Sequence, residues 1–276
     1  MDGSANVTLG APGAPLIFDG GTLRMATDFP YATLSALHAD HPVSFTANKD
    51  AGFEHLNNSF PTFTIDMAID LGTGTFWPES SSAKTIVLTQ ANTWGQINLS
   101  SAVVEVSTLD QLGPAGSIVQ FGSGSTADLD AGTLRITGTT LSDFGDRIFQ
   151  TTETKNAEFD IVEAAHTFTL DRVLAMTTGD LIKSGNGTLA LSGTINTYTG
   201  ATTVAAGTLA LIDGSQASTI TVSSGASLGF TLGSATTSSA SVDLTNGGVT
   251  ISNPDAVDGS LSRPELVEGQ KHCGPK

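Results

Sequence analysis

Short strands of alternating polarity, separated by glycine turns, dominate residues 179–213. Leu189 and Leu191 alternate with small or polar residues in one strand, and Leu209 and Leu211 do so in another. This period of two is typical of a strand with one buried face and one face in water. Because the turns are so short, we expect the chain to coil repeatedly and to stack each coil on the preceding one.

Motifs within this stretch follow one another in a fixed order. They are Leu181-Ile182-Lys183-Ser184-Gly185, Gly187-Thr188-Leu189, Leu191-Ser192-Gly193, Asn196-Thr197-Tyr198-Thr199-Gly200, Thr203-Val204 and Gly207-Thr208-Leu209. The series resembles the autotransporter-associated β-strand repeat of bacterial type V secreted proteins, with residues 179–213 as the best-matched copy. The resemblance implies a right-handed parallel β-helix that forms the stalk of a secreted passenger. It also implies a role in presentation and adhesion, without catalytic residues.

Similar motifs recur earlier in the chain and predict an internal repeat. The segment that begins at Ile86 aligns with the segment that begins at Leu189, so that Asn92 and Trp94 correspond to Asn196 and Tyr198. Further echoes join residues 19–24 to 130–135 and residues 63–66 to 168–171. A unit of roughly 105 to 110 residues therefore occurs about twice, and we expect coils of roughly 20 to 25 residues within it.

We predict an all-β chain in which residues 1–252 form a single right-handed parallel β-helix, or solenoid. Residues 30–59 break the alternation and are predicted to form an irregular loop that protrudes from the rod. One helical turn around Leu34 and Leu37, ended by Pro42, is expected inside this loop. Loops on repeat scaffolds often bind ligands, so this loop is the predicted binding region; an insertion without a role is the alternative.

The two ends of the sequence carry separate expectations. Residues 253–276 are proline-rich and are predicted to form a disordered tail. Residues 262–270 resemble the translation of an interspersed palindromic repeat found between bacterial genes. We therefore interpret the tail as read-through sequence and Cys273 as an incidental thiol. Residues 1–6 lack the features of a signal peptide, so the chain is interpreted as a fragment of a longer reading frame or as exported by another route.

Composition and charge restrict the function. With 31 Gly, 10 Pro and 14% charged residues the chain is unlike a helical protein, whereas 39% hydrophobic residues can supply a core. The net charge is −16 and the 11 basic residues are scattered singly, so we expect neither nucleic-acid binding nor attraction to anionic lipid. The acidic surface is expected to favour solubility, with a weakly bound cation or a basic partner as the alternative.

Paired carboxylates are the first candidates for chemistry, because some β-helices cleave polysaccharides with them. Asp66 and Asp70 share strand parity and are expected about 13 Å apart. Asp160, Glu163 and Asp171 form a second group. Glycoside hydrolysis needs carboxyl groups within roughly 5 to 10 Å, so we expect these acids to be solvated, although neighbouring coils can supply closer pairs.

The remaining motifs are expected to be structural, and no catalytic, cofactor-binding or metal residue is predicted. They are the hydrolase-like Gly225-Ala226-Ser227-Leu228-Gly229, the glycine pairs at Gly122/Gly124 and Gly185/Gly187, the histidines His38, His41 and His55, and the Thr-Phe-Thr segments at residues 62–64 and 167–169. The glycine motifs lack the helix that a hydrolase elbow or dinucleotide site requires. The histidines match no zinc spacing, and the threonine pairs are too far apart for an ice-binding ladder.

The sequence thus favours a structural or adhesive stalk at the cell surface or in the extracellular space. Its expected partner is a protein or glycan on a host or neighbouring cell, and the resemblance implies membrane linkage only through a barrel domain not present in this sequence. One alternative is a carbohydrate-active β-helix enzyme, favoured if carboxylates of adjacent coils converge beside Trp77 or Trp94. Because Trp94 occupies the position of Tyr198 in the repeat, we expect it to be packed inside. A second alternative is a self-associating extracellular filament or matrix protein.

Overall fold

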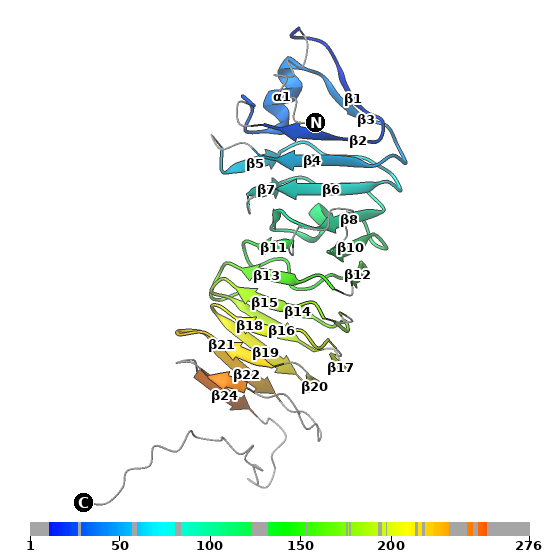
Figure 1. Cartoon of the computed structure of the whole chain (residues 1–276). Helices are drawn as coiled ribbons and strands as arrows, with labels where there is room; N and C mark the ends of the chain where they lie inside the picture. Colours follow the sequence, from blue (N-terminus) through cyan, green and yellow to red (C-terminus); the bar gives the residue numbers. More distant parts are fainter. Residues whose placement is uncertain are drawn as a thin grey trace, which may run out of the picture.

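The computed structural model shows an elongated stack of parallel strands (Figure 1). It describes residues 11–26, 29–56, 60–80, 84–122, 132–152, 154–174, 176, 178–192, 195–196, 198–212, 215–216, 219–231, 242–244 and 248–252.

Three long sheets build the rod, and every strand pairing in them is parallel. Sheet I contains, in spatial order, β12 (Ile148–Thr151), β10 (Ile118–Phe121), β8 (Gln96–Leu99), β6 (Thr75–Ser80), β4 (Ala51–His55) and β2 (Gly21–Met25). Sheet II contains β23 (Val242–Leu244), β21 (Ile220–Val222), β18 (Thr202–Val204), β15 (Leu181–Ser184), β13 (Ala157–Ile161), β11 (Thr133–Ile136), β9 (Val103–Val106), β7 (Thr85–Leu88) and β5 (Thr62–Ile65). Sheet III contains β14 (Thr167–Leu170), β16 (Thr188–Leu191), β19 (Thr208–Ile212), β22 (Ser227–Thr231) and β24 (Gly248–Ser252). Two short pairs complete the strands, β1 (Leu16–Phe18) with β3 (Val43–Phe45) and β17 (Ile195–Asn196) with β20 (Ser215–Gln216).

Neighbouring strands of a sheet lie one coil apart in the chain, which is the arrangement of a parallel β-helix and confirms the predicted fold class. Coil length varies more than the sequence suggests. In sheet II the paired residues Thr85 and Val103 are separated by 18 positions, whereas Val103 and Thr133 are separated by 30. The right-handed sense of the coil stays a prediction.

One coil in the middle of the rod changes which sheets are used. Sheet I ends at β12 and sheet III begins at β14, while sheet II continues through β13. The coil that contains β12, β13 and β14 therefore gives one strand to each sheet. As a consequence, segments that match in sequence occupy different sheets: Ile86 lies in sheet II, and its counterpart Leu189 lies in sheet III.

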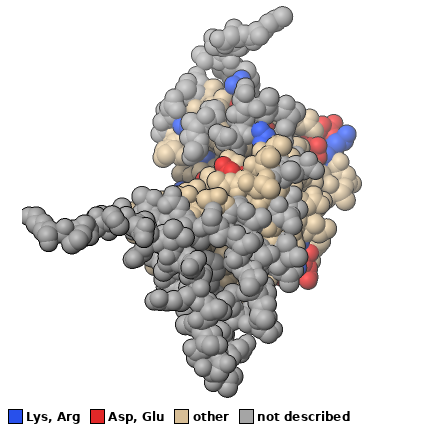
Figure 2. Space-filling model, turned by 60° about the horizontal axis from the view of Figure 1, so that its bottom comes forward, with Lys and Arg blue, Asp and Glu red and all other residues tan. Residues whose placement is uncertain are grey.

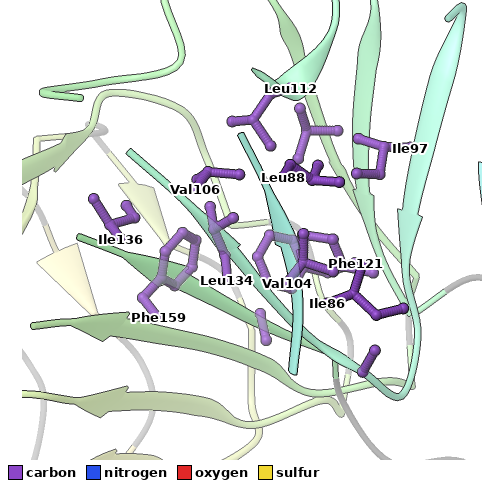
Figure 3. Close-up of a cluster of buried hydrophobic side chains, with 14 of the residues drawn as sticks. Ile86, Leu88, Ile97, Val104, Val106, Leu112, Phe121, Leu134, Ile136 and Phe159 are labelled. Carbon is purple, nitrogen blue, oxygen red and sulfur yellow. The ribbon is translucent and has the colours of Figure 1, made fainter. Parts of the chain in front are cut away.

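Ladders of apolar side chains fill the interior. Ile86, Val104, Leu134 and Phe159 lie in register on successive strands of sheet II, and all are fully buried. Figure 3 shows them in one cluster with residues of sheet I such as Ile97. Burial of each such side chain stabilises the fold by about 1.5–3 kcal/mol. In this ladder Val104 and Leu134 therefore have an apolar neighbour on both sides, whereas Phe159 lies between Leu134 and Lys183.

Aromatic rings form a second element of the core. Phe76 and Trp94 are stacked with ring centroids 4.8 Å apart and an interplanar angle of 11°. Phe121 and Phe159 lie 5.0 Å apart in a later part of the rod. Trp94 is fully buried, and its Nε1 donates a hydrogen bond to the carbonyl of Leu112 at 3.0 Å. The expectation that Trp94 packs inside is therefore confirmed.

Residues 30–56, the described part of the predicted protruding loop, contain a helix and two strands, so the prediction of a loop is wrong there. The helical turn that was expected there is present as α1 (Leu34–Asp40), which lies at the N-terminal end of the rod (Figure 1). Leu34 and Leu37 are fully buried, and the Thr33 side chain caps the helix by accepting from the backbone N–H of Ala36 at 3.1 Å. Strand β4, in the same segment, is an interior strand of sheet I. This strand was missed in the sequence because Gly52 and His55 interrupt the apolar alternation of β4.

Only two helical elements occur in the described part of the chain, α1 and the 3₁₀ turn η1 (Leu109–Leu112). Neither resembles a membrane-spanning helix, and no such helix exists among the described residues. The predicted tail, residues 253–276 with Cys273, lies outside the residues that the structure describes.

Candidate ligand-binding surface on sheet I

The outer face of sheet I is built by the alternation of its strands. In β4, Phe53 and His55 point inward and are buried, so Gly52 and Glu54 belong to the outer face. The strand register places Thr22 of β2, Gly52 of β4 and Trp77 of β6 side by side in one row. Arg24, Glu54 and Glu79 form the adjacent row in the same way. Three successive coils thus align aromatic, charged and small residues on one surface.

A hollow of about 750 Å³ lies on this surface and is open to solvent. We call it the Trp77 hollow. It is lined by Asp19, Gly20, Gly21, Thr22, Lys49, Asp50, Ala51, Gly52, Trp77 and Glu79. Trp77 is partly exposed, in contrast to the fully buried Trp94. The hollow therefore combines one accessible indole with carboxylates, a lysine and a hydroxyl.

The carboxylates of the hollow have distinct environments. Glu79 is partly buried, and this burial, together with the neighbouring charge of Glu54, raises its pKa. Glu54 is paired with the Arg24 guanidinium at 3.1 Å. Asp50 accepts a hydrogen bond from the backbone N–H of Thr75 at 2.8 Å, which ties it to the next coil. The adjacent carboxylates Glu54 and Glu79 thus differ in their surroundings, since Glu54 has an arginine partner and Glu79 has a raised pKa.

The carboxylates singled out in the sequence lie elsewhere, and the side chains of four of the five have partners, whereas Glu163 Oε2 is buried without a hydrogen bond to the described residues. Asp66 accepts hydrogen bonds from the backbone N–H of Ser35 at 2.8 Å and from its hydroxyl at 2.5 Å, and so fixes the first turn of α1. Asp70 Oδ1 accepts from the backbone N–H of Gly72 at 3.0 Å. Asp160 is paired with Arg135 at 2.7 Å and Asp171 with Arg172 at 3.3 Å, and Glu163 belongs to the turn after β13. None of these five acids lines the Trp77 hollow.

The histidines are spread over separate surroundings. His38 Nδ1 accepts from the backbone N–H of Val43 at 3.0 Å, whereas His41 Nδ1 lies 3.2 Å from the carbonyl of Ala14. His55 is enclosed inside sheet I, where burial lowers its pKa. Within the part of the chain that the structure describes, no three His, Cys, Asp or Glu side chains come together as metal ligands.

Charged groups on the remaining described surface are sparse. In the view of Figure 2 the described acidic and basic side chains form small groups among uncharged described residues, and in one of these groups the two signs adjoin. On sheet II, Arg135 lies between Glu105 at 3.9 Å and Asp160 at 2.7 Å, so it offsets one of these two negative charges. The Trp77 hollow therefore differs from these paired surface charges by its exposed ring and its concave shape.

Two buried polar side chains mark the repeat that the sequence singled out. Asn196 Oδ1 accepts from the backbone N–H of Leu174 at 3.2 Å, and Asn92 Oδ1 accepts from that of Ile69 at 3.0 Å. Both asparagines thus satisfy the backbone of the preceding coil. Their role agrees with the alignment that matched Asn92 with Asn196.

Lys183 is a functional element of the fold that sequence reasoning missed. Its side chain is fully buried, and Nζ donates to the carbonyls of Ser184, Gly185 and Ala206. Burial lowers its pKa to about 8, while the nearby charge of Asp160 acts in the opposite direction. Lys183 occupies an inward position in the alternating pattern of β15, and this position could have predicted from the sequence that its side chain is buried.

A known family model matches the part of the chain that contains Lys183 and Asn196. Residues 181–211 fit the family model of the passenger-associated-transport-repeat. The chain carries an autotransporter passenger repeat. This passenger repeat spans β15 to β19 and contains Lys183, Asn196 and the fully buried Tyr198, whose hydroxyl lies 2.6 Å from that of Thr202.

The chain is similar to the adhesin BmaC autotransporter of Brucella suis biovar 1 (strain 1330). It is 31% identical over an alignment of 237 residues, which covers 75% of this chain and 7% of the adhesin. The chain therefore corresponds to a small part of the length of that relative. No solved structure matches the chain.

Proposed function

We propose that this chain is a stalk segment from the passenger of an autotransporter-like surface protein and that it presents an adhesive surface without catalysis. The main support is that the passenger repeat at residues 181–211 coincides with regularly stacked coils of the rod. The similarity to a protein named as an adhesin points in the same direction. The proposed location is the cell surface or the extracellular space, and the proposed partner is a ligand on a host or neighbouring cell.

The interior of the rod suits a rigid spacer. Buried asparagines satisfy backbone groups between coils, and apolar ladders continue from coil to coil. A repeat scaffold of this kind gains its stability from contacts between neighbouring coils, so it stays extended and holds its outer face at a fixed orientation. A fixed outer face lowers the entropic cost of binding.

Adhesion by the purified full chain tests this function. Beads coated with the chain would be counted on layers of mammalian and bacterial cells, with beads coated with the heat-unfolded chain as the control. We expect the folded chain to increase bead retention on at least one cell type. Equal retention of both kinds of beads on all layers would contradict an adhesive role.

Two carboxylates on neighbouring coils favour a second candidate, a carbohydrate-active β-helix enzyme. Glu54 and Glu79 are in register on adjacent strands beside Trp77. Strands in a sheet are about 4.8 Å apart, close to the roughly 5 Å between the two carboxyl groups of a retaining glycosidase. In such an enzyme Glu79, with its raised pKa, would be the acid, and Glu54, paired with Arg24, would be the nucleophile.

Release of reducing ends from polysaccharides tests this second candidate. An enzyme of this type would lose activity in both Glu54→Gln and Glu79→Gln variants. A complete lack of products from a broad set of polysaccharides would exclude it.

A further inference from the structure

We propose that the Trp77 hollow is a glycan-binding subsite that takes neutral or amino-sugar residues. The proposal rests on the adhesive function above and names its ligand class. The sugar ring would lie on the exposed face of the Trp77 indole, and its hydroxyls would bind the polar groups at the rim.

The shape of the hollow depends on the absence of a side chain at Gly52. Gly52 is in register between Thr22 and Trp77, and a Cβ at this position would collide with Oγ1 of Thr22. The space over Gly52 is therefore occupied by the Thr22 side chain, which places the Thr22 hydroxyl on the outer face, in the same strand row as the indole of Trp77.

The rim carries groups that match sugar hydroxyls. Asp19, Asp50 and Glu79 supply acceptors, whereas Lys49 and the Thr22 hydroxyl supply donors. A sugar ring has an apolar face for the indole and hydroxyls that both donate and accept, so it can use both parts of this surface.

Other ligand classes fit the same surface less well. A bound cation would require three converging ligands, and the described residues contain no such group. A nucleic acid or an anionic glycan would meet the carboxylates of Asp19, Asp50 and Glu79, opposed in the hollow by Lys49 alone. The charge balance therefore selects against sialylated and uronic-acid sugars and accommodates neutral and amino sugars.

The surface is rigid and continues beyond the hollow. Strand β4 is an interior strand of sheet I, where Gly52 pairs with Thr22 on one side and with Trp77 on the other; β6 is also paired with β8, at Thr75 and Phe76. On the next coils Gln96 Nε2 donates to Gln120 Oε1 at 2.6 Å, and Gln120 is in register with Gln150. These outward amides extend a polar strip along the rod axis, so we expect longer oligosaccharides to bind more tightly than single sugars.

Tryptophan fluorescence gives a direct test, because the chain has only two tryptophans. Trp94 is fully buried, so a change on addition of ligand reports Trp77. The full chain would be titrated with neutral oligosaccharides, with N-acetylated amino-sugar oligosaccharides and with sialylated oligosaccharides. We expect saturable binding of at least one of the first two classes and weaker binding of the sialylated ones.

Variants then locate the binding. Trp77→Ala should weaken binding by about tenfold, measured by calorimetry, and Trp77→Phe should restore most of it. Ile148→Ala is the matched control, because Ile148 is an exposed apolar residue (48% exposed) on another strand of sheet I, and it should bind like the wild type. Unchanged circular dichroism and melting temperature would show that each variant is folded.

Two results would overturn the proposal: the wild type binds none of the oligosaccharides, or Trp77→Ala binds as tightly as the wild type. If Trp77→Ala fails to fold, the wild-type fluorescence titration still decides the first point. The bead assay on the same variants separates this proposal from adhesion as such. If Trp77→Ala still binds cells, the adhesive function stands and the hollow is not its binding site. If the wild type binds glycans but not cells, the glycan subsite stands and the adhesive function fails.

Discussion

The buried ammonium of Lys183 makes the stability of the passenger repeat depend on pH. Its Nζ donates to three backbone carbonyls, two of which belong to Ser184, the last residue of β15, and to Gly185, which follows it. The third carbonyl belongs to Ala206, one coil further along. The lysine thus joins two coils, but it does so in a place that disfavours its positive charge.

The sign of the pH effect follows from the direction of the pKa shift. Burial lowers the pKa of Lys183 from 10.5 to about 8, so between these values the unfolded chain binds the proton more firmly than the folded chain. The free energy of unfolding must therefore rise with pH across this window and be independent of this group below it. A pKa difference of this size corresponds to about 3 kcal/mol.

The assay compares the wild type with Lys183→Met, which keeps the length of the side chain and removes the charge. Urea unfolding followed by circular dichroism at pH 7.5 and at pH 10.5 would give the difference between the two proteins at each pH. We expect the wild type to gain about 3 kcal/mol relative to the variant at the higher pH. Lys49→Met, at an exposed lysine, is the control and should show no such gain.

Direct titration of Lys183 measures its pKa in the folded chain. In a chain with ¹³C-labelled lysine, the Lys183 side-chain signal should titrate near pH 8. A midpoint near 10.5, or a wild-type gain below about 0.5 kcal/mol, would refute the inference that burial governs this group.

Three further predictions concern contacts between coils. Asn196→Ala and Asn92→Ala should each lower the free energy of unfolding by about 1–3 kcal/mol, because each leaves a backbone N–H of the preceding coil without its acceptor; urea unfolding measures this, and a loss below 0.3 kcal/mol would contradict it. Arg135→Ala should cost up to about 1 kcal/mol at low salt and less at high salt, because it leaves Glu105 and Asp160 without their shared partner on a partly exposed surface; a loss that does not depend on salt would argue against an electrostatic origin. Gly187→Ala should lower the melting temperature, because a Cβ there would lie 2.6 Å from the Glu163 carbonyl oxygen and 2.9 Å from that of His166; Gly21→Ala, where nothing lies within 4 Å, is the control and should melt close to the wild type.

The fold could be predicted from the sequence because the patterns that indicate it, strand alternation and short motifs, each lie within a few residues of the chain. Leu189 and Leu191 alternate within one strand, and both are buried as the period of two requires. The correspondence of Asn92 with Asn196 was also visible, since both stand before an aromatic residue that packs inside the rod. These features depend only on residues a few positions apart, and the structure places them as the pattern indicated.

The candidate surface could not be predicted, because it depends on which residues of successive coils meet. Glu54 and Glu79 are adjacent through the register of β4 with β6, and Arg24 reaches Glu54 through the register of β2 with β4. Coil lengths from 18 to 30 residues in sheet II show that no fixed offset would find such neighbours. Local alternation says that Glu79 faces outward, but only the lengths of the intervening turns decide which carboxylate lies beside it.

The change of sheets in the middle of the rod explains why a repeat of the sequence need not be a repeat of the surface. Phe63 and Phe168 correspond in sequence and are both buried, yet the first lies in sheet II and the second in sheet III. An inward apolar position tolerates this shift, because the core is continuous behind all three sheets. An outward position does not, since it moves to another side of the rod with other neighbours. The repeated motifs therefore preserve the interior of the rod, whereas the Trp77 hollow belongs to the N-terminal coils where β2, β4 and β6 lie together.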